Sequence, residues 1–371
     1  MAITQRAFLL PIAQYLRSQG WLVDAVAAEI KACTACQSSY NCVHEIDWTR
    51  NPLNLRNLTR ASAQIRKIIE QGGYDLVHVH TPVAAFVTRY ALRNLRRTGK
   101  PKIIYTAHGF HFHRNGRPLS NAIFLGLEKL AGRWTDYLVV INREDEAAAK
   151  RYRIVPLERV RYMPGIGIDL SQYSAERVSK EDIEQVRQEL RLKDSQKLFL
   201  MVAAFDPGKR HKDALQALSL LNDARAVLAF AGEGPLRSQI EELARNAGML
   251  EQVRFLGFRK DIPTLIRASL ATILTSEREG LPRAVMESMA LGTPVIGADA
   301  RGTRDLLESG AGIIVPVGDT VALAGAMRHF LENPEEALRM GERGLEAVRA
   351  YDLTKILHLH VELYNEALGV R

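Results

Sequence analysis

The strongest constraint on the fold is a regular alternation of short apolar segments with amphipathic helical segments. In the first half, the apolar segments that we interpret as strands are WLVDAVA, DLVHVHTP, KIIYTAHG and DYLVVIN. In the second half they are LFLMVAAF, AVLAFAGEG, VRFLGF, ATILTS, PVIGAD and GIIVPV. This alternation is typical of parallel sheets that helices cover on both faces. The sequence therefore predicts an α/β chain with two Rossmann-like domains.

The length and one break in the pattern set the expected domain boundaries. With 371 residues, the chain is too long for one ordinary core and suits two domains of about 150 to 190 residues. Proline and glycine interrupt the periodicity at 163–169, MPGIGID. We predict an N-terminal domain over 1–165, a C-terminal domain over 166–350 and a final helical segment over 351–371.

The beginning of the chain departs from the expected pattern. A doubly wound domain normally opens with a strand whose carboxyl end lines the ligand cleft. Here a helical pattern begins at once, around 8–18. Either the true start lies upstream or this domain lacks its first strand, and both explanations stay open.

Positive charge is concentrated in the first half of the chain. Residues 1–166 hold 24 lysines and arginines against 12 aspartates and glutamates, whereas the remainder holds 26 against 30. A basic half suggests an anionic partner, namely membrane lipid, a phosphorylated substrate or nucleic acid. The segment TPVAAFVTRYALRNLRRTGK places Arg89, Arg93, Arg96 and Arg97 on one helix. We expect this helix to contact anionic lipid near the acceptor; the alternative is an ordinary solvated face.

The cellular compartment follows from what the sequence lacks. It has no apolar run of 18 residues, and its N-terminal stretch has no small-residue cleavage site. We predict a cytoplasmic protein that binds the inner face of the cell membrane peripherally. Cys33, Cys36 and Cys42 fit a reducing compartment. A redox pair and part of a metal site remain alternatives, but without a second CxxC we expect no function there.

The segment EREGLPRAVMESMALGTPVIGAD contains a potential phosphate site. It follows the strand ATILTS, and Pro282 suits the first position of a helix that runs to about Leu291 and stops at Gly292. The N–H groups of Gly280 and Leu281 then lie at a helix N-terminus, which favours a phosphate.

Two carboxylates bracket that helix start. Glu279 precedes it and Glu287 lies within the helix. Ionised carboxylates accept strong hydrogen bonds from hydroxyl groups. A phosphate flanked by two polyol-binding carboxylates describes a nucleotide sugar.

These residues carry a family resemblance. The segment resembles the E-x7-E region of retaining glycosyltransferases of family 4, which have the GT-B fold. FLLPIAQYLRSQGW, DLVHVHTP, YTAHGF, TDYLVVIN, VRYMPGIGID, AGEGPLR and VRFLGFRKDI occur in the family's order. The resemblance implies metal-independent transfer from a nucleotide diphosphate sugar with retention of configuration. It also implies that the C-terminal helix crosses back to the N-terminal domain.

The resemblance assigns roles to individual residues. Glu279 contacts the donor sugar, Glu287 the ribose, and the helix start with Gly280, Leu281 and Pro282 the diphosphate. Lys209 matches the diphosphate-binding lysine, where a cation offsets the charge of the leaving group.

One position departs from the family pattern. The family's arginine five residues before Lys209 is Ala204 here. The departure puts the neutralisation of the phosphates in doubt, and Arg210 is the candidate to compensate for it.

Further donor contacts follow from the same resemblance. Gly232 and Gly234, in AGEGPLR, allow close approach of the backbone to the donor, although glycine also serves simple turns. Phe258 and Arg259 lie in the loop that holds the base. Main-chain contacts there fit uracil, so we expect UDP.

His108 matches the family's histidine near the reacting sugar; a hydrogen-bonded histidine at a strand end is the alternative. The spacing of His108, His111 and His113 also suits a metal site. Because no Asp-x-Asp occurs and oriented partners are not evident, we expect neither a metal nor another cofactor.

The resulting hypothesis is a hexosyltransferase-type enzyme, EC 2.4, which moves a hexose or N-acetylhexosamine. The variants YTAHGFHFH and MPGIGID are similar to capsular and exopolysaccharide members of the family. We expect a glycan or polyprenyl-diphosphate-linked acceptor and no nucleic acid partner. A UDP-sugar 2-epimerase and an inactive nucleotide-sugar-binding remnant stay as alternatives. A dinucleotide oxidoreductase is disfavoured because no complete G-x-G-x-x-G follows a strand.

Overall fold

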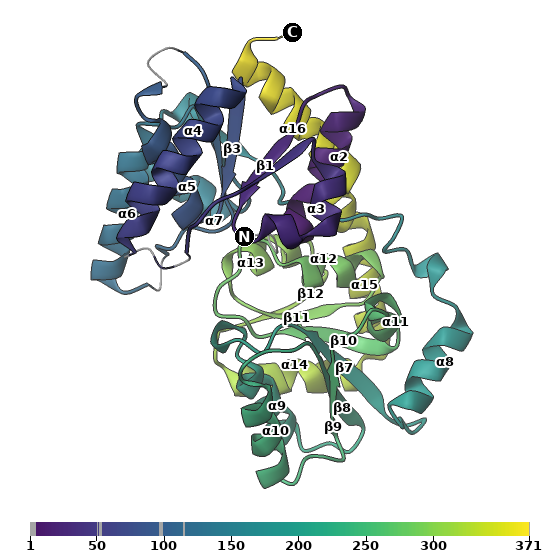
Figure 1. Ribbon diagram of the computed structural model, residues 1–371. Helices are drawn as coiled ribbons and strands as arrows, with labels where there is room; N and C mark the ends of the chain where they lie inside the picture. The colour runs from purple at the N-terminus through teal and green to yellow at the C-terminus, as the bar shows by residue number, and fades with distance from the viewer. Residues whose placement is uncertain (1–4, 50, 52–53, 96–98, 114–115, 371) are drawn as a thin grey trace. The chain divides into compact units, whose positions relative to one another are not determined.

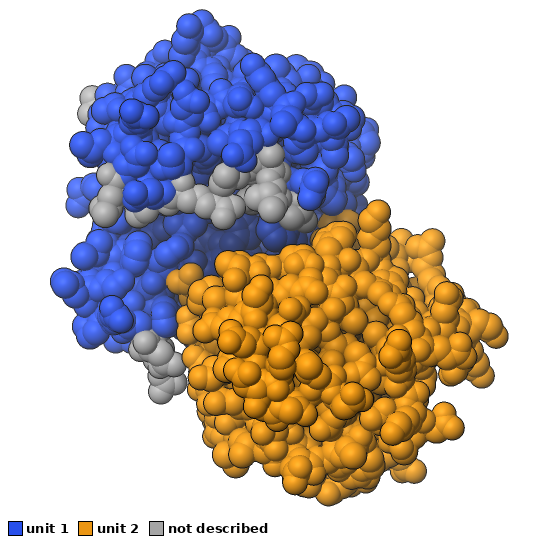
Figure 2. Space-filling model, turned by 60° about the horizontal axis from the view of Figure 1, so that its bottom comes forward, with its two compact units in different colours: residues 1–166, 354–371 blue, residues 167–353 orange. Residues whose placement is uncertain are grey.

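The structure is a computed structural model that describes residues 5–49, 51, 54–95, 99–113 and 116–370. The chain divides into two compact units, which Figure 2 colours separately. Unit 1 comprises Met1–Ile166 and Thr354–Arg371, and unit 2 comprises Gly167–Leu353.

Unit 1 is an α/β unit with parallel strands (Figure 1). Its elements are η1 (Gln5–Leu9), α2 (Leu10–Ser18), β1 (Asp24–Ala27), η2 (Ile30–Ala32), α3 (Thr34–Ser39), β2 (Cys42–Glu45), η3 (Asn57–Ala61), α4 (Ser62–Gly72), β3 (Leu76–His80), α5 (Pro82–Leu92), β4 (Lys102–Ala107), α6 (Pro118–Gly132), β5 (Tyr137–Val140), α7 (Arg143–Tyr152), η5 (Leu157–Arg159), β6 (Val160–Tyr162) and α16 (Leu353–Leu368).

The strands of unit 1 form two separate sheets. β1 pairs with β2, and β3, β4, β5 and β6 form a second sheet in that order. One face of the larger sheet packs its apolar side chains against α4, α5, α6 and α7. The other face carries His78, which contacts Tyr364 and His360 of α16. Because strand side chains alternate between faces, the five-residue strand β3 contributes to the apolar core on one face and to a polar cluster on the other.

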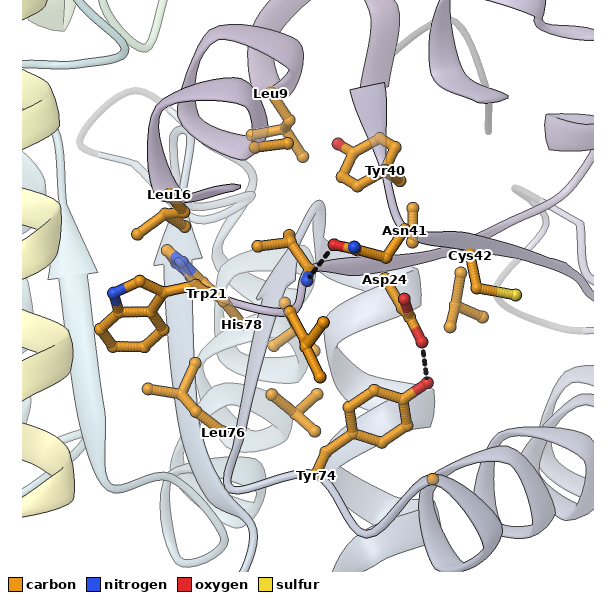
Figure 3. Close-up of a pocket in the computed structure, with 18 of the residues that line it drawn as sticks. Leu9, Leu16, Trp21, Asp24, Tyr40, Asn41, Cys42, Tyr74, Leu76 and His78 are labelled. Atoms are coloured by element: carbon orange, nitrogen blue, oxygen red, sulfur yellow. Dashed lines mark hydrogen bonds between the residues drawn. The ribbon is translucent and has the colours of Figure 1, made fainter. Parts of the chain in front are cut away.

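A cavity of about 920 Å³ lies between the two sheets of unit 1. β1 and β3 line it, together with residues of α2, α4 and α16. Figure 3 shows Trp21, Asp24 and His78 around it, with the Tyr74 hydroxyl donating to Asp24 Oδ2 at 2.5 Å. Among the described residues no strand pairs with both β1 and β3. Each of these strands therefore borders the cavity with one edge that has no strand partner.

Unit 2 is a second α/β unit with the doubly wound arrangement (Figure 1). Its elements are η6 (Ala175–Arg177), α8 (Lys180–Glu189), β7 (Lys197–Val202), η7 (Pro207–Lys209), α9 (His211–Leu221), β8 (Ala226–Ala231), α10 (Arg237–Asn246), β9 (Val253–Gly257), α11 (Ile262–Arg267), β10 (Ser269–Leu274), α12 (Arg283–Ala290), β11 (Val295–Ala298), α13 (Arg301–Leu307), β12 (Gly312–Val315), α14 (Thr320–Glu332), α15 (Pro334–Val348) and η8 (Arg349–Tyr351).

The sheet of unit 2 is parallel throughout, with strand order β12-β11-β10-β7-β8-β9. Helices α9, α10 and α14 build a core on one face, and α8, α11, α12 and α13 build a core on the other. All six residues of β8 are buried, as expected for a central strand covered on both faces. The chain order reverses between β7 and β10, so their carboxyl ends mark the switch point where such sheets bind ligands.

The α/β prediction with two Rossmann-like domains is confirmed. Each segment predicted as a strand overlaps one of the observed strands, and β7 and β10 begin one and two residues before their predicted segments. Two strands were missed, β2 and β6: β2 reads Cys-Val-His-Glu and has no buried residue, and β6 has only three residues. The prediction that Pro282 opens a helix is wrong by one residue, because Pro282 is the N-cap and α12 begins at Arg283.

Two further sequence expectations can be compared with the structure. Cys33 and Cys36 form a disulfide bond, whereas Cys42 is free and exposed. The CxxC therefore pairs with itself, where a reducing compartment had been expected. No described helix is long and apolar enough to cross a membrane.

Candidate active site

Two loops of unit 2 meet at the switch point of its sheet. The Thr275 hydroxyl, at the end of β10, donates to the carbonyl oxygens of Lys209 and Arg210 at 2.8 and 3.0 Å. The N–H of Glu277 donates to the carbonyl of Gly208 at 3.0 Å. The loop after β7 is thereby fastened to the loop after β10, which positions the side chains of both loops.

Lys209 and Glu279 face one another across these fastened loops. Lys209 Nζ lies 2.5 Å from Glu279 Oε1, and the side chains are 31% and 12% exposed. The pair is reachable from solvent while each member holds the other in place. A ligand that carries both a phosphate and hydroxyl groups can take the ammonium with the first and the carboxylate with the second.

Glu287 lies in a more enclosed setting on α12. Arg283 Nε donates to Glu287 Oε1 at 2.8 Å, and Glu287 is 7% exposed. Burial raises the pKa of Glu287, although Arg283 and a hydrogen bond from Tyr173 oppose the rise. Burial and the nearby carboxylate raise the pKa of Tyr173 to about 12. The structure thus gives Glu287 polar partners from two segments.

Arg210 is tied to acidic neighbours. Its Nε and Nη2 donate to the carboxylate of Asp213 at 2.6 and 3.2 Å, and Nη1 lies 3.9 Å from Glu277 Oε2. The family has an arginine at the position of Ala204. To take over the role of that arginine, Arg210 would have to release Asp213. Compensation by Arg210 stays a prediction.

Gly232 and Gly234 are explained by contacts within the protein. A Cβ at Gly232 would lie 2.0 Å from the carbonyl oxygen of Ala203, and one at Gly234 would lie 2.6 Å from the backbone nitrogen of Phe205. Both glycines let the loop after β8 pack directly on the loop after β7. A donor contact at these positions stays a prediction.

The predicted base loop combines an exposed ring with a fixed arginine. Phe258 is 75% exposed. Arg259 donates to both carboxylate oxygens of Asp261 at 2.8 and 2.6 Å and also pairs with Glu189. These hydrogen bonds raise the pKa of Arg259. The guanidinium therefore fixes the shape of the loop, and the exposed Phe258 is the part that a base can reach.

The sequence did not reveal the support behind Gly280 and Leu281. A Cβ at Gly302, in α13, would lie 2.0 Å from the carbonyl oxygen of Gly280, so only glycine allows this approach. The hydroxyls of Ser276 and Thr303 are buried and have no hydrogen-bond partner among the described residues. Their signal in the sequence is weak: Ser276 only ends the predicted strand ATILTS, and Thr303 lies outside the segments that were singled out.

In unit 1, His108 belongs to a cluster of four histidines. His80 Nδ1 lies 3.1 Å from His108 Nε2, and the ring of His78 lies 4.2 Å from that of His80. His78 also contacts the Tyr364 hydroxyl at 2.5 Å, and His360 of α16 completes the group. Of this group the sequence had pointed to His108. His360 could not be linked to it from the sequence, because helix α16 is remote along the chain.

Burial keeps these imidazoles neutral. It lowers the pKa of His108 to about 4, with a smaller contribution from His360. Burial also lowers the pKa values of His78, His80 and His360. At neutral pH His108 can donate or accept a hydrogen bond, but it does not offer a positive charge.

Within the part of the chain that the structure describes, His108 belongs to no group of three potential metal ligands. The His111 ring packs 5.1 Å from that of Phe124. Among the described residues one group, Asp24, Cys42 and His44, brings three possible ligand atoms within 4.8 Å of one another. Asp24 already accepts a hydrogen bond from Tyr74. Metal-independent transfer stays a prediction.

The predicted membrane contact by α5 is wrong for Arg89, which is 1% exposed. Arg89 Nη2 lies 3.1 Å from Glu128 Oε2, and its guanidinium lies 4.0 Å from the Tyr105 ring. Arg93 stacks on Tyr90 at 3.9 Å. Arg96 and Arg97 lie outside the described residues. Arg89 therefore faces inward because helix α6 supplies a buried carboxylate for it.

Comparisons with known proteins agree with this fold. Residues 7–172 match the family described as Glycosyltransferase Family 4, and residues 182–347 match Glycosyl transferases group 1. EpsD of Bacillus subtilis (strain 168), which is assigned as a glycosyltransferase, is 30% identical over 97% of this chain and 93% of its own length.

Two other similar proteins carry more specific names. An Escherichia coli UDP-Gal:alpha-D-GlcNAc-diphosphoundecaprenol alpha-1,3-galactosyltransferase is 26% identical over 70% of this chain and 67% of its own length. The structure of Anabaena HepE in complex with UDP has a TM-score of 0.79, with 21% identity over 96% of this chain and 95% of that chain.

Two Rossmann-like units with these matches define a glycosyltransferase of the GT-B fold, EC class 2.4. The chain belongs to glycosyltransferase family 4.

Proposed function

We propose that this enzyme moves a hexose or N-acetylhexosamine from a UDP-sugar to a glycan or polyprenyl-diphosphate-linked acceptor, with retention of configuration. The observation that carries the proposal is the pairing of Lys209 with Glu279 at the switch point of unit 2. An ammonium for the diphosphate and a carboxylate for the sugar hydroxyls suit the two ends of such a donor.

The similar proteins support the choice of donor and acceptor. HepE was solved with UDP and with UDP-glucose. The Escherichia coli relative is named for a UDP-sugar and a diphosphoundecaprenol acceptor. By analogy, we assign this chain to polysaccharide or glycolipid synthesis.

In the proposed mechanism the acceptor attacks from the face that the nucleotide leaves. The bond from the sugar's anomeric carbon to the phosphate oxygen breaks, and a bond from that carbon to the acceptor oxygen forms. The acceptor's proton passes to the leaving phosphate, whose charge Lys209 offsets. Glu279 holds the sugar hydroxyls, and the family resemblance assigns His108, whose imidazole is neutral, a role at the reacting sugar.

Calorimetric titration with UDP, GDP and ADP tests the nucleotide. We expect UDP to bind at least about tenfold more tightly than the other two, because a base contact of this kind contributes on the order of 1 to 2 kcal/mol. Equal affinity for all three would contradict the donor assignment.

A panel of UDP-sugars with a polyprenyl-diphosphate-sugar acceptor then tests the reaction. Proton NMR of the product should show the donor's anomeric configuration, whereas an inverted product would refute the mechanism. Conversion of a UDP-sugar alone at its second carbon would indicate the epimerase. UDP binding without turnover on any acceptor would indicate an inactive binding protein.

A further inference from the structure

Helix α6 has an outward face made almost entirely of apolar side chains. Leu119, Ile123, Leu127 and Leu130 are 76%, 54%, 39% and 40% exposed. They recur at intervals of three or four residues and so share one side of the helix. Ala122 and Gly126, which are also exposed, fill the space between them.

The inward face of α6 is apolar as well. Phe124 and Leu125 pack on the core of unit 1, and Ala131 is completely buried. An ordinary surface helix places its polar residues outward. This helix has apolar residues on both sides, which is the pattern of an element that is covered on both sides.

The exposed charged residues on α6 and next to its two ends are all cationic. Arg117 lies before the helix, and Lys129 and Arg133 lie at its end, all three exposed. The one acidic residue between 116 and 133, Glu128, points inward to Arg89. The exposed surface of α6 therefore combines apolar side chains with cations and has no exposed carboxylate.

Two half-buried aromatic side chains lie near the end of the helix. The Trp134 ring lies 6.0 Å from Tyr90, on which the Arg93 guanidinium stacks. Tryptophan, tyrosine and arginine are the residues that suit the boundary between lipid and water.

We propose that the outward face of α6 docks unit 1 on an anionic membrane surface. The helix would lie in the plane of the membrane, with its leucines among the acyl chains and its cations at the head groups. Its 15 residues span about 22 Å in that plane.

The charges favour lipid over a second copy of the chain. In a two-fold pairing of antiparallel α6 helices, Lys129 and Arg133 of one copy would face Arg117 of the other. No exposed carboxylate on α6 would offset that repulsion. An anionic lipid surface satisfies both the apolar side chains and the cations.

Docking at α6 deepens the proposed function. The benefit of docking rests on that function, but the binding of α6 to a membrane does not. α6 follows His108 along the chain, through the loop after β4. A membrane-bound α6 would bring that loop near a lipid-linked acceptor. Flotation needs neither donor nor acceptor, so a failed transferase assay leaves the docking test intact.

Flotation with phosphatidylcholine vesicles, with and without phosphatidylglycerol, tests the proposal. The protein should float with the anionic vesicles, and raised salt should weaken this binding. The double variant Leu119→Glu/Ile123→Glu should reduce the bound fraction at least about tenfold, since it places two charges in the apolar face.

Leu338→Glu is the matched control, because Leu338 is 60% exposed on a helix of unit 2. It should float like the original chain, and circular dichroism should show that all variants fold. Failure of the original chain to float, or equal flotation of the double variant, would overturn the proposal. So would a dimer in sedimentation that the double variant dissociates while flotation is unchanged.

Discussion

Two ion pairs, one in each unit, have similar chemistry and different surroundings. Lys209 and Glu279 lie on loops after parallel strands and are 31% and 12% exposed. Arg89 and Glu128 lie on packed helices, and their side chains are 1% and 12% exposed. In the second pair, the Tyr105 hydroxyl also donates to Glu128 at 3.0 Å.

The difference separates a pair that can exchange its partners from one that cannot. The Lys209 ammonium can turn to a phosphate, because solvent reaches it and its loop is fixed by backbone hydrogen bonds. Arg89 has no such access, and removal of either partner would leave a buried charge. We therefore expect the first pair to control activity and the second to control stability.

The largest expected effect is on turnover. Replacing Glu279 with Ala removes the carboxylate assigned to the donor sugar, and kcat should fall by about 10²- to 10³-fold. Steady-state transfer with a UDP-sugar measures this change. The control is Glu277→Ala on the same loop. Glu277 is exposed, and its carboxylate makes only a long contact with Arg210, at 3.9 Å. Equal losses in the two variants would remove the special role of Glu279.

The matching change in unit 1 should affect stability. Arg89→Ala leaves Glu128 buried without its cation, which costs on the order of 3 kcal/mol of unfolding free energy. Urea unfolding measures it, and UDP affinity should be unchanged. Arg93→Ala, at the half-buried arginine that follows α5, should cost less than about 1 kcal/mol. If Arg89→Ala weakened UDP affinity and left stability normal, the Arg89–Glu128 pair would not be the one that controls stability.

A smaller effect is expected on nucleotide affinity. Lys209→Ala removes the cation for the diphosphate, and the Kd for UDP should rise by about 10- to 100-fold in calorimetric titration. Lys212→Ala is the control, because Lys212 is exposed in the first turn of α9. An unchanged Kd would assign Lys209 a purely structural role in holding Glu279.

The smallest effect concerns pH. The pKa of His108 falls from 6.5 to about 4 on folding, so between these values the unfolded chain binds more protons. Stability should therefore decrease as pH falls from 6.5 towards 4 and level off below. His108→Asn should reduce this slope by up to about 1.4 kcal/mol per pH unit. Unfolding at several pH values measures it, with the exposed His358→Asn as control; an unchanged slope in His108→Asn would contradict the burial.

The strands that sequence reasoning found are those with a continuous apolar run. β8 is buried along its whole length, and its six apolar residues predict a strand from the sequence. β2 was missed because its edge position leaves its residues unburied and allows a polar sequence. The candidate site follows the same rule. Glu279 was found through the local helix-start pattern and Lys209 through the family resemblance, whereas Gly302 and His360 become neighbours of the site residues only after folding.

The sequence by itself determined the two α/β units, the order of nearly all strands and the segments that carry the predicted donor-binding residues. Local periodicity and turn residues determine these features, and each is complete within a few residues. The tertiary structure alone decided that Arg89 turns inward, that four histidines gather in unit 1 and that the outward face of α6 is apolar. These outcomes depend on which side of an element meets a partner distant in the chain, and that is fixed by packing.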